Sequence, residues 1–282
     1  MMARVLCVGV ASLDTIVLVD KYPAADERVI ALDTMRAAGG PAMTAAVTIA
    51  RLGVDVALSC VIGDDEPGRF IFDTLKREGI DTKNVIVDPK IATAIGTIVV
   101  SKSEETRAIM ARPHNTLPSK PANINDYQWL HVDHFGVRAM KNWGVTRGQG
   151  PRISIDLGYS VPGVSPGDFD LYVPSEKITT DVSTAVRDKN MVVVSQGREG
   201  SSFNDGIESG VVPVIDTEVI STLGAGDVFH GALVAAQVWG KSLEESVHIA
   251  TIVAGLKCRS LDGQSGIPTK AELDAYMAGV RH

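Results

Sequence analysis

The sequence predicts an α/β fold built on a central, mostly parallel sheet. Short β-branched runs that are apolar throughout alternate with Ala-rich or amphipathic stretches, which is typical of buried parallel strands joined by helices. The alternation begins with a strand at 4–10, a helix at 42–52, a strand at 56–62 and a helix at 66–77. Later core strands are expected at 127–132, 153–155, 171–174 and 191–194, and long helices at 225–239 and 243–258.

The remaining elements carry weaker signals. We expect strands at 201–204 and 211–215, a weakly marked helix at 140–149 and a terminal helix at 271–278. The connection between residues 183 and 191 looks short for a full helix.

Two pairs of strands interrupt the alternation. The pair 16–19 and 29–35 and the pair 94–101 and 106–111 have no helix between their members, so each is expected to be antiparallel and to stand off the main sheet. The two hairpins could pair into one small sheet that covers a site. No internal repeat or linker is visible, so residues 1–282 are expected to form a single domain, with lid segments at about 15–36 and 93–111.

Composition excludes several classes of function. Lys and Arg number 27 against 34 Asp and Glu, which gives 27 − 34 = −7, and no basic run is present. We therefore expect no nucleic-acid partner and no anionic membrane surface, and no apolar stretch approaches the ~20 residues that span a bilayer. The three cysteines are scattered, which favours buried thiols in a reducing compartment over a metal framework. A cytoplasmic location is expected.

The most informative stretch is the turn at residues 221–227. Its sequence Ser-Thr-Leu-Gly-Ala-Gly-Asp precedes a run of good helix formers. A Gly-rich turn that opens a helix offers free N–H groups and the positive end of the helix dipole, which suits a phosphate. Asp227 would repel a phosphate. Either it only complements the helix dipole, or it takes a proton from a hydroxyl that attacks a phosphoryl group.

Three other places could contact a ligand. Asp14 follows the first strand, where ligands of open α/β sheets bind, although a turn-forming Asp is the simpler interpretation. Gly39 and Gly40 precede a helix with Thr44 in its first turn, and Gly197 and Gly200 follow the strand that ends near Ser195. Both glycine pairs also suit ordinary tight turns.

Taken in order, these motifs resemble the ribokinase-like family of sugar and nucleoside kinases along nearly the whole chain. The early motif is Gly39-Gly40 with an Ala-rich helix ending in Leu52-Gly53, and the late motif is the turn at 221–227. Within the family, the segments 226–232, 254–258 and 266–268 look most like sulfofructose kinases and ketohexokinases. The resemblance implies a three-layer fold with a β lid that often forms a homodimer.

The resemblance also implies roles for individual residues. Asp227 would be the base, and the N–H groups of Gly224, Ala225 and Gly226 would hold the transferred phosphoryl group. The sugar would be held by Asp14, Gly39, Gly40 and Thr44, and the ATP site would be lined by Ser195, Gly197, Gly200, Thr222 and Ala254. Mg²⁺ would be bound through water by Glu176.

Three positions depart from the family pattern. Ser221 replaces an Asp that helps to organise the turn and a nearby monovalent cation, so we expect the activity to depend only weakly on such a cation. Ile178 is apolar where the family often has a Glu that acts on Mg²⁺ through water, and Glu176 could compensate. Thr44 replaces an Asn, which changes how the sugar is gripped.

We therefore expect an ATP-dependent kinase that phosphorylates a primary hydroxyl of a ketose-type sugar. The alternatives are a nucleoside kinase, which would want an aromatic pocket in a chain with only 5% aromatic residues, and a regulator that has lost turnover. Basic residues on the lid segments suggest an anionic sugar, such as a sulfo- or phosphosugar, as acceptor. They are Arg28, Arg36, Arg107, Arg112 and the nearby His114. Solvated lid charges with a neutral ketohexose as acceptor are the simpler interpretation.

Overall fold

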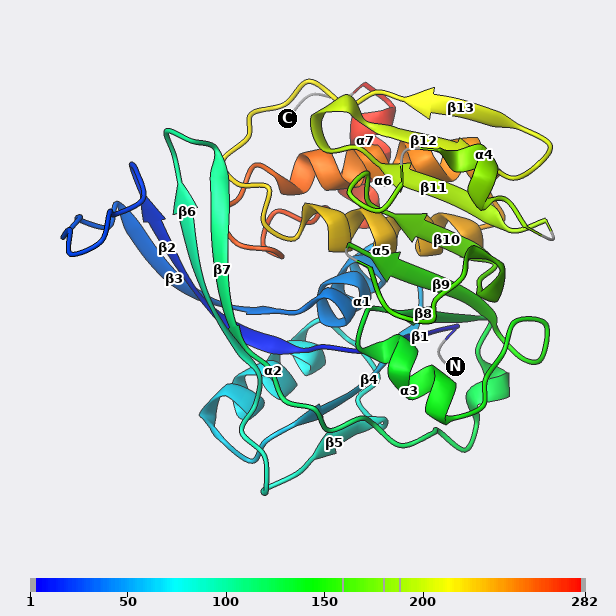
Figure 1. The fold of residues 1–282 in the computed structure, drawn as a ribbon, viewed down its shortest axis with the longest axis horizontal. Coiled ribbons are helices and arrows are strands. Elements are labelled where there is room, and N and C mark those ends of the chain that lie inside the picture. Colours follow the sequence, from blue (N-terminus) through cyan, green and yellow to red (C-terminus); the bar gives the residue numbers. More distant parts are fainter. Residues whose placement is uncertain (1–3, 159, 180, 188, 280–282) are drawn as a thin grey trace.

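The computed structural model describes residues 4–158, 160–179, 181–187 and 189–279. Its strands form two separate sheets. The larger has nine strands between two layers of helices, and the smaller has four strands and projects from one side of the larger (Figure 1). No helix in the described part of the chain is long and apolar enough to cross a membrane.

The large sheet has the strand order β13-β12-β11-β10-β9-β8-β1-β4-β5. Neighbouring strands pair in parallel in the part of the sheet that runs β11-β10-β9-β8-β1-β4-β5. The strands β12 and β13 add an antiparallel edge beyond β11. Chain order reverses beside β1, and open α/β sheets bind ligands at the carboxyl ends of strands near such a reversal. The strands are β1 (Val5–Val8), β4 (Val56–Ile62), β5 (Val85–Val87), β8 (Trp129–Val132), β9 (Arg152–Leu157), β10 (Leu171–Pro174), β11 (Met191–Ser195), β12 (Ser201–Asn204) and β13 (Ser209–Val212).

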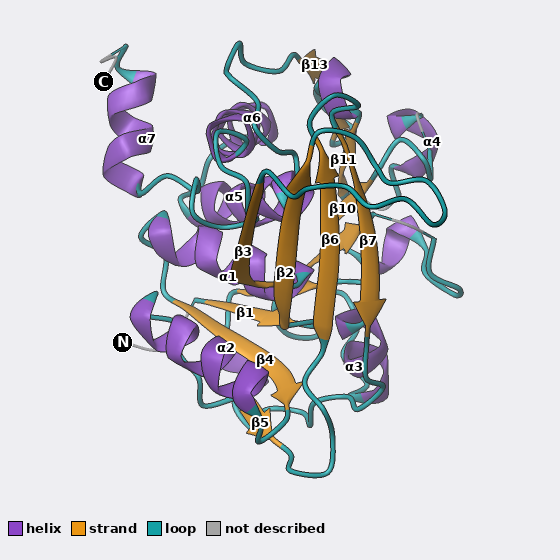
Figure 2. Cartoon of the chain, turned by 90° about the vertical axis from the view of Figure 1, so that its left-hand side faces the viewer, coloured by secondary structure: helices purple, strands orange, loops and turns teal. Residues whose placement is uncertain are grey.

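Alternate side chains of the central strands enter two different cores. In β1, Val5 and Cys7 belong to one core, and Leu6 and Val8 belong to the other. The two layers of helices can be followed on opposite sides of the sheet in Figure 2. The first core packs under α1 (Pro41–Arg51), α2 (Glu66–Arg77), α5 (Ala225–Val238), α6 (Leu243–Lys257) and α7 (Lys270–Met277), and the second under α3 (Gly136–Asn142) and α4 (Val182–Ala185).

Local sequence signals explain where several helices begin. Pro41 starts α1 directly after Gly40, whose φ of 91° suits glycine. The Asp65 carboxylate caps α2, and Ser242 forms a capping box with Glu245 at α6. These caps satisfy N–H groups that would otherwise lack partners.

The small sheet, called the lid sheet below, joins the two hairpins. Its order is β3-β2-β6-β7, with antiparallel pairing inside each hairpin and parallel pairing of β2 with β6. The expectation that the hairpins combine into one sheet is therefore met. Its strands are β2 (Ser12–Val19), β3 (Asp33–Gly39), β6 (Ile95–Ser101) and β7 (Thr106–Arg112).

Three predicted elements are displaced. The strand predicted at 29–35 is found at Asp33–Gly39, because residues 20–32 form a loop that closes with the Leu32 N–H on the Leu18 carbonyl at 2.7 Å. The strand predicted at 211–215 is Ser209–Val212 and ends before Pro213, which cannot donate to a sheet.

The helix predicted at 140–149 is α3, at Gly136–Asn142. It begins earlier because the Asp133 carboxylate accepts the N–H groups of Phe135 and Gly136 at 2.9 and 2.7 Å. It ends at a turn in which Gly144 has a φ of 66°.

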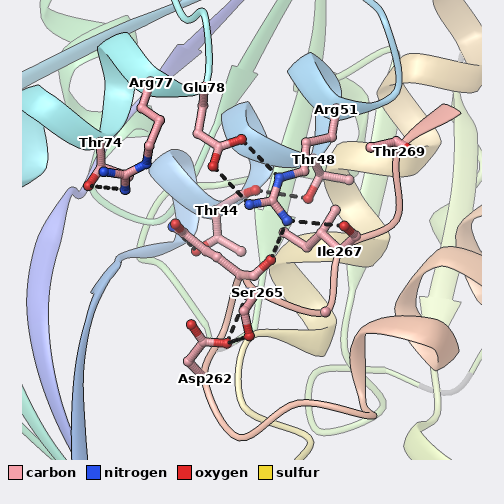
Figure 3. A network of polar contacts seen from close by, with 12 residues as sticks. Thr44, Thr48, Arg51, Thr74, Arg77, Glu78, Asp262, Ser265, Ile267 and Thr269 are labelled. Carbon is pink, nitrogen blue, oxygen red and sulfur yellow. Dashed lines mark hydrogen bonds and ion pairs between the residues drawn. The ribbon is translucent and has the colours of Figure 1, made fainter.

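Arg51 ties the C-terminal segment to α1 and α2. Its guanidinium forms two hydrogen bonds with the Glu78 carboxylate, at 2.9 and 2.8 Å, and donates to the carbonyl oxygens of Gln264 and Ile267 (Figure 3). The fork of Arg51 suits such paired contacts. The loop that it anchors packs against Gly224, where a Cβ atom would lie 2.9 Å from Gly263.

Candidate active site

The turn before α5 presents backbone N–H groups at a helix N-terminus. Gly224 caps the helix in the left-handed conformation, with a φ of 75°, and it lies too close to Gly263 for a side chain. The Ala225 N–H donates to the Thr222 carbonyl at 3.2 Å, so the turn itself uses one of the three groups predicted to bind a phosphoryl group. Within the described residues, the N–H groups of Gly224 and Gly226 have no backbone partner. They remain suited to an anion.

Asp227 lies in the first turn of α5, half-buried, and its carboxyl group is hydrogen-bonded to that of Asp156. Burial, followed by the nearby charge of Asp156, holds the pKa of Asp227 well above its usual range. The pKa of Asp156 is raised to about 7, first by burial and then by Asp133. Two adjacent carboxyl groups that resist ionisation share a proton near neutral pH.

A polar strip on the large sheet supports this pair. Asp156, near the end of β9, lies 3.2 Å from Nε2 of His230 on α5. His131 on β8 contacts Ser154 at 2.9 Å, and its ring lies 6.2 Å from that of His230. Burial lowers the pKa of both histidines to about 3, so both rings are neutral. The strip therefore adds polar contacts beneath Asp227 without adding a cation.

Asp14 occupies a pocket made by glycines of both neighbouring strands. Its carboxylate accepts the Ser12 hydroxyl at 2.9 Å. A Cβ atom would lie 2.1 Å from this carboxylate at Gly39 on β3, and 2.5 Å from it at Gly96 on β6. Burial raises the pKa of Asp14. Only glycines leave room for the carboxylate here, and Gly96 was not singled out in the sequence.

Gly40 and Thr44 lie at the start of α1, next to the Asp14 pocket. A Cβ atom at Gly40 would lie 2.5 Å from the Val10 carbonyl, so this turn also requires glycine. Thr44 is buried, and its hydroxyl accepts the Gln264 amide at 3.3 Å. Thr44 is therefore already held by a residue from the other end of the chain.

A cavity of about 430 Å³ is lined in part by the turn before Asp227, through Thr222, Ala225 and Gly226. Gly200, with a φ of 91°, approaches the Val212 carbonyl so closely that a Cβ atom would lie 2.1 Å from it. All five residues predicted to line a nucleotide site line this one cavity, together with Phe229 and Cys258: Ser195, Gly197, Gly200, Thr222 and Ala254. The structure thus brings together groups that lie on β11, the turn and α6.

Comparison with known proteins decides the family. The model of the pfkB family of carbohydrate kinases matches residues 2–144 and 172–270. The chain belongs to the pfkB family of carbohydrate kinases. Its fold is the ribokinase-like fold, and it is a phosphotransferase that acts on an alcohol group.

Relatives of known name span nearly the whole chain. Ribokinase of Bacillus subtilis is 24% identical over 300 residues, covering 98% of this chain and 100% of that protein. Ketohexokinase of Mus musculus is 24% identical over 297 residues, covering 94% and 98%. The crystal structure of a putative ribokinase from Agrobacterium tumefaciens is similar with a TM-score of 0.86, at 26% identity, and covers 99% of this chain and 98% of that one.

The predicted magnesium contact in this carbohydrate kinase rests on one exposed carboxylate. The Glu176 N–H donates to the Ser195 carbonyl at 2.9 Å, and Glu176 Oε1 would lie 4.0 Å from a Cβ atom at Gly197. Ile178 packs against the second core, so it takes no part in metal binding. Among the described residues, no group of three or more His, Cys, Asp or Glu side chains could hold a metal.

The basic residues predicted on the kinase's lid segments have different partners and do not gather at one site. Arg112 donates to the Thr93 carbonyl at 3.2 Å, and it pairs in register with Ile95, next to Gly96. Arg36 forms an ion pair with Glu66 at 2.7 Å. Arg28 belongs to the exposed loop 20–32, which lies at the outer end of the lid sheet (Figure 1). The sequence predicted Arg28 near the Asp14 pocket, and the structure does not place it there. His114 contacts the Val61 carbonyl at 2.9 Å.

Arg107 and Asp156 acquire a place at the site that the sequence did not assign. Arg107 on β7 donates to the Thr222 hydroxyl at 2.9 Å, across 115 residues of chain. Its charge opposes the rise in the pKa of Asp227. The sequence marked Arg107 only as one of several lid charges and assigned no role to Asp156. No local signal connects either residue with the turn.

We predict that Asp156→Asn changes how stability depends on pH. A carboxyl whose pKa is raised on folding stabilises the protein below its unfolded pKa, and this stability is lost as pH rises through the folded value, about 7 for Asp156. Between pH 5 and pH 8 the variant should therefore gain about 1–3 kcal/mol in free energy of unfolding relative to wild type. Denaturant unfolding at several pH values measures this difference.

The titration of His131 and His230 in the unfolded chain is common to both proteins and cancels in the difference. Asp227, whose pKa Asp156 helps to raise, changes the difference in the same direction as Asp156 itself. Asp274→Asn, at an exposed ion pair with Lys270, is the control and should show no such trend. If wild type and Asp156→Asn keep a constant difference across this range, the pair does not share a proton as described.

Proposed function

We propose that this carbohydrate kinase uses ATP to phosphorylate a primary hydroxyl of a ketose-type sugar. The observation that supports it most is the position of Asp227: a half-buried carboxyl with a raised pKa, beside the free N–H groups of an anion-binding turn. A buried carboxyl with a raised pKa beside a phosphate site fits the role of a group that takes a proton from the attacking hydroxyl.

In this proposal the sugar lies between Asp14 and Asp227. Asp14 holds sugar hydroxyls by accepting hydrogen bonds from them, and Gly39, Gly40 and Thr44 allow the sugar to approach the backbone closely. Asp227 takes the proton from the attacking hydroxyl as its oxygen bonds to phosphorus. The N–H groups of Gly224 and Gly226 stabilise the charge on the phosphoryl oxygens, and Arg107 adds a positive charge from the lid sheet.

ATP would occupy the 430 Å³ cavity, which is lined by Ser195, Gly197, Gly200 and Ala254. Mg²⁺ is usually held by one or two carboxylates together with substrate phosphates and water, so Glu176 near Gly197 fits a water-mediated contact. The metal would neutralise charge on the phosphates. The lid sheet would exclude water from the phosphoryl group, which limits hydrolysis of ATP.

A ketose is proposed because a named ketohexokinase is among the relatives that span the chain. An anionic ketose would be recognised at Arg112, which lies in register beside the Asp14 pocket. The direct test is a coupled assay of ADP release with ketoses, aldoses, sulfosugars and nucleosides. Preferred turnover of an aldose or of a nucleoside, or of no acceptor at all, would refute the proposal.

We predict that Asp227→Asn lowers turnover by about two to four orders of magnitude, the usual cost of losing a general base. Affinity for ATP should remain, because the cavity is lined by other residues. Steady-state kinetics and calorimetry with ATP measure the two effects. Asp64→Asn, at an exposed pair with Arg69, is the control. Near wild-type turnover of Asp227→Asn would show that this carboxylate is not the base.

We predict that Arg112→Ala raises KM for a sulfonated or phosphorylated ketose roughly ten- to hundredfold, as expected for losing a charged hydrogen bond, with little effect on fructose. Arg28→Ala is the matched control, since Arg28 is exposed and belongs to the loop 20–32, away from the Asp14 pocket. Higher catalytic efficiency of wild type on fructose than on any anionic ketose would end the anionic hypothesis and leave a neutral ketohexose.

We predict that the chain forms a homodimer through the lid sheet. Both edge strands, β3 and β7, offer unpaired backbone groups, and Ile109 and Met110 of β7 are exposed, as are Ile30 and Leu32 near β3. Light scattering at micromolar concentration measures the mass, and Met110→Lys should shift the protein toward monomer. A fully active wild-type monomer would count against the dimer.

A further inference from the structure

A lysine is completely buried behind the anion-binding turn. Lys257, the last residue of α6, is 0% exposed, and its ammonium donates to the carbonyl oxygen of Ser221 at 3.1 Å. The same end of α6 holds the turn through its backbone, because the Cys258 carbonyl accepts the N–H groups of Ile220 and Ser221 at 2.8 and 3.2 Å. Ser221, the first residue of the turn, is therefore held through both its backbone N–H group and its carbonyl oxygen.

Burying an ammonium is costly unless its charge is compensated. The charges that act on Lys257 are those of Asp262 in the following loop, Arg107 of β7 and Asp227 of α5. The Cys258 thiol beside it stays neutral, because burial raises its pKa above the usual value. Burial lowers the pKa of Lys257 to about 8, and Asp262 and Asp227 oppose the decrease. The side chain is therefore still charged at neutral pH, and its positive charge lies close to the site.

Backbone carbonyl oxygens are also the ligands that bind K⁺ in proteins. The Ser221 carbonyl is such a ligand, and an ammonium of this chain already occupies hydrogen-bonding distance from it. Ser221 itself carries no carboxylate, and its hydroxyl accepts the Leu223 N–H at 3.1 Å within the turn. A second cation at this carbonyl would be repelled by Lys257.

We propose that Lys257 is the built-in cation of the anion-binding turn: it positions Ser221 and supplies the positive charge that an added monovalent cation would otherwise provide. Lys257 is a positioning residue, since it contacts the turn and not the substrate. The inference rests on the proposed phosphoryl transfer at this turn. It gives a structural cause for the weak cation dependence expected from Ser221.

The test compares the full chain with Lys257→Ala and Lys257→Met in potassium and in tetramethylammonium chloride at equal ionic strength and pH 7. Wild type should turn over equally in both salts. Both variants should lose about ten- to hundredfold in kcat in tetramethylammonium, the usual cost of losing a residue that orients the groups of a site. Ammonium or methylammonium should restore Lys257→Ala, which leaves room for the cation. Neither should restore Lys257→Met, whose side chain fills the space.

Lys241→Ala, which removes an exposed lysine paired with Glu245, is the control and should match wild type in every salt. Strong stimulation of wild type by potassium would overturn the inference. A folded Lys257→Ala with undiminished kcat, or with a loss that no small cation restores, would overturn it equally.

Calorimetric titration of wild type with ATP in the two salts keeps the inference testable if the variants do not fold. Equal affinity in potassium and tetramethylammonium is expected, and a requirement for potassium would refute it. This titration needs no turnover, so it also separates the two proposals. A protein that phosphorylates no sugar but binds ATP equally in both salts contradicts the proposed function and leaves the role of Lys257 intact.

Discussion

The site depends on keeping a carboxylate beside a turn that attracts anions. Free N–H groups of Gly224 and Gly226 favour negative charge, yet Asp227 lies among them, half-buried and hydrogen-bonded to a second carboxyl group. Sharing a proton with Asp156 removes one of two adjacent negative charges. The neutral His230 contacts Asp156 from α5 itself, so one helix carries both Asp227 and part of the support of its partner Asp156. Burial and the nearby Asp156 raise the pKa of Asp227, as the proposed transfer of a proton to this carboxyl requires.

In the other half of the candidate site, the backbone of two glycines lies directly against the Asp14 carboxylate. Asp14 fits only because Gly39 and Gly96 flank it in neighbouring strands of the lid sheet, whose register places both beside it. The lid sheet is therefore more than a cover, since it builds the pocket around this carboxylate. Arg107 on the same sheet reaches Thr222 of the turn. A movement of the lid sheet would change the pocket around Asp14 and the charge around Asp227 together.

Much of the fold was predictable because its signals are local. Buried parallel strands are apolar throughout, and helix starts carry their own caps, so the α/β alternation and the two hairpins were identified from residues next to one another. The displaced elements are those whose limits depend on distant or irregular contacts. The Asp133 carboxylate starts α3, and the loop closed by Leu32 and Leu18 delays β3. In the sequence, Arg28 and Arg112 were equally good candidates for binding an anionic sugar. Only the folded hairpins showed that Arg112 pairs with Ile95 beside the Asp14 pocket, whereas Arg28 lies in the loop 20–32.

The sequence by itself determined the turn at 221–227, the glycines at 39–40, and the glycines at 197 and 200, because each motif is contiguous and its geometry follows from backbone rules. The tertiary structure alone decided what surrounds them. Asp156 and Lys257 reach the turn from a strand end and a helix end, and Arg107 reaches it from the lid sheet. Electrostatic contacts of this kind depend on distance in space, which a linear sequence does not encode residue by residue.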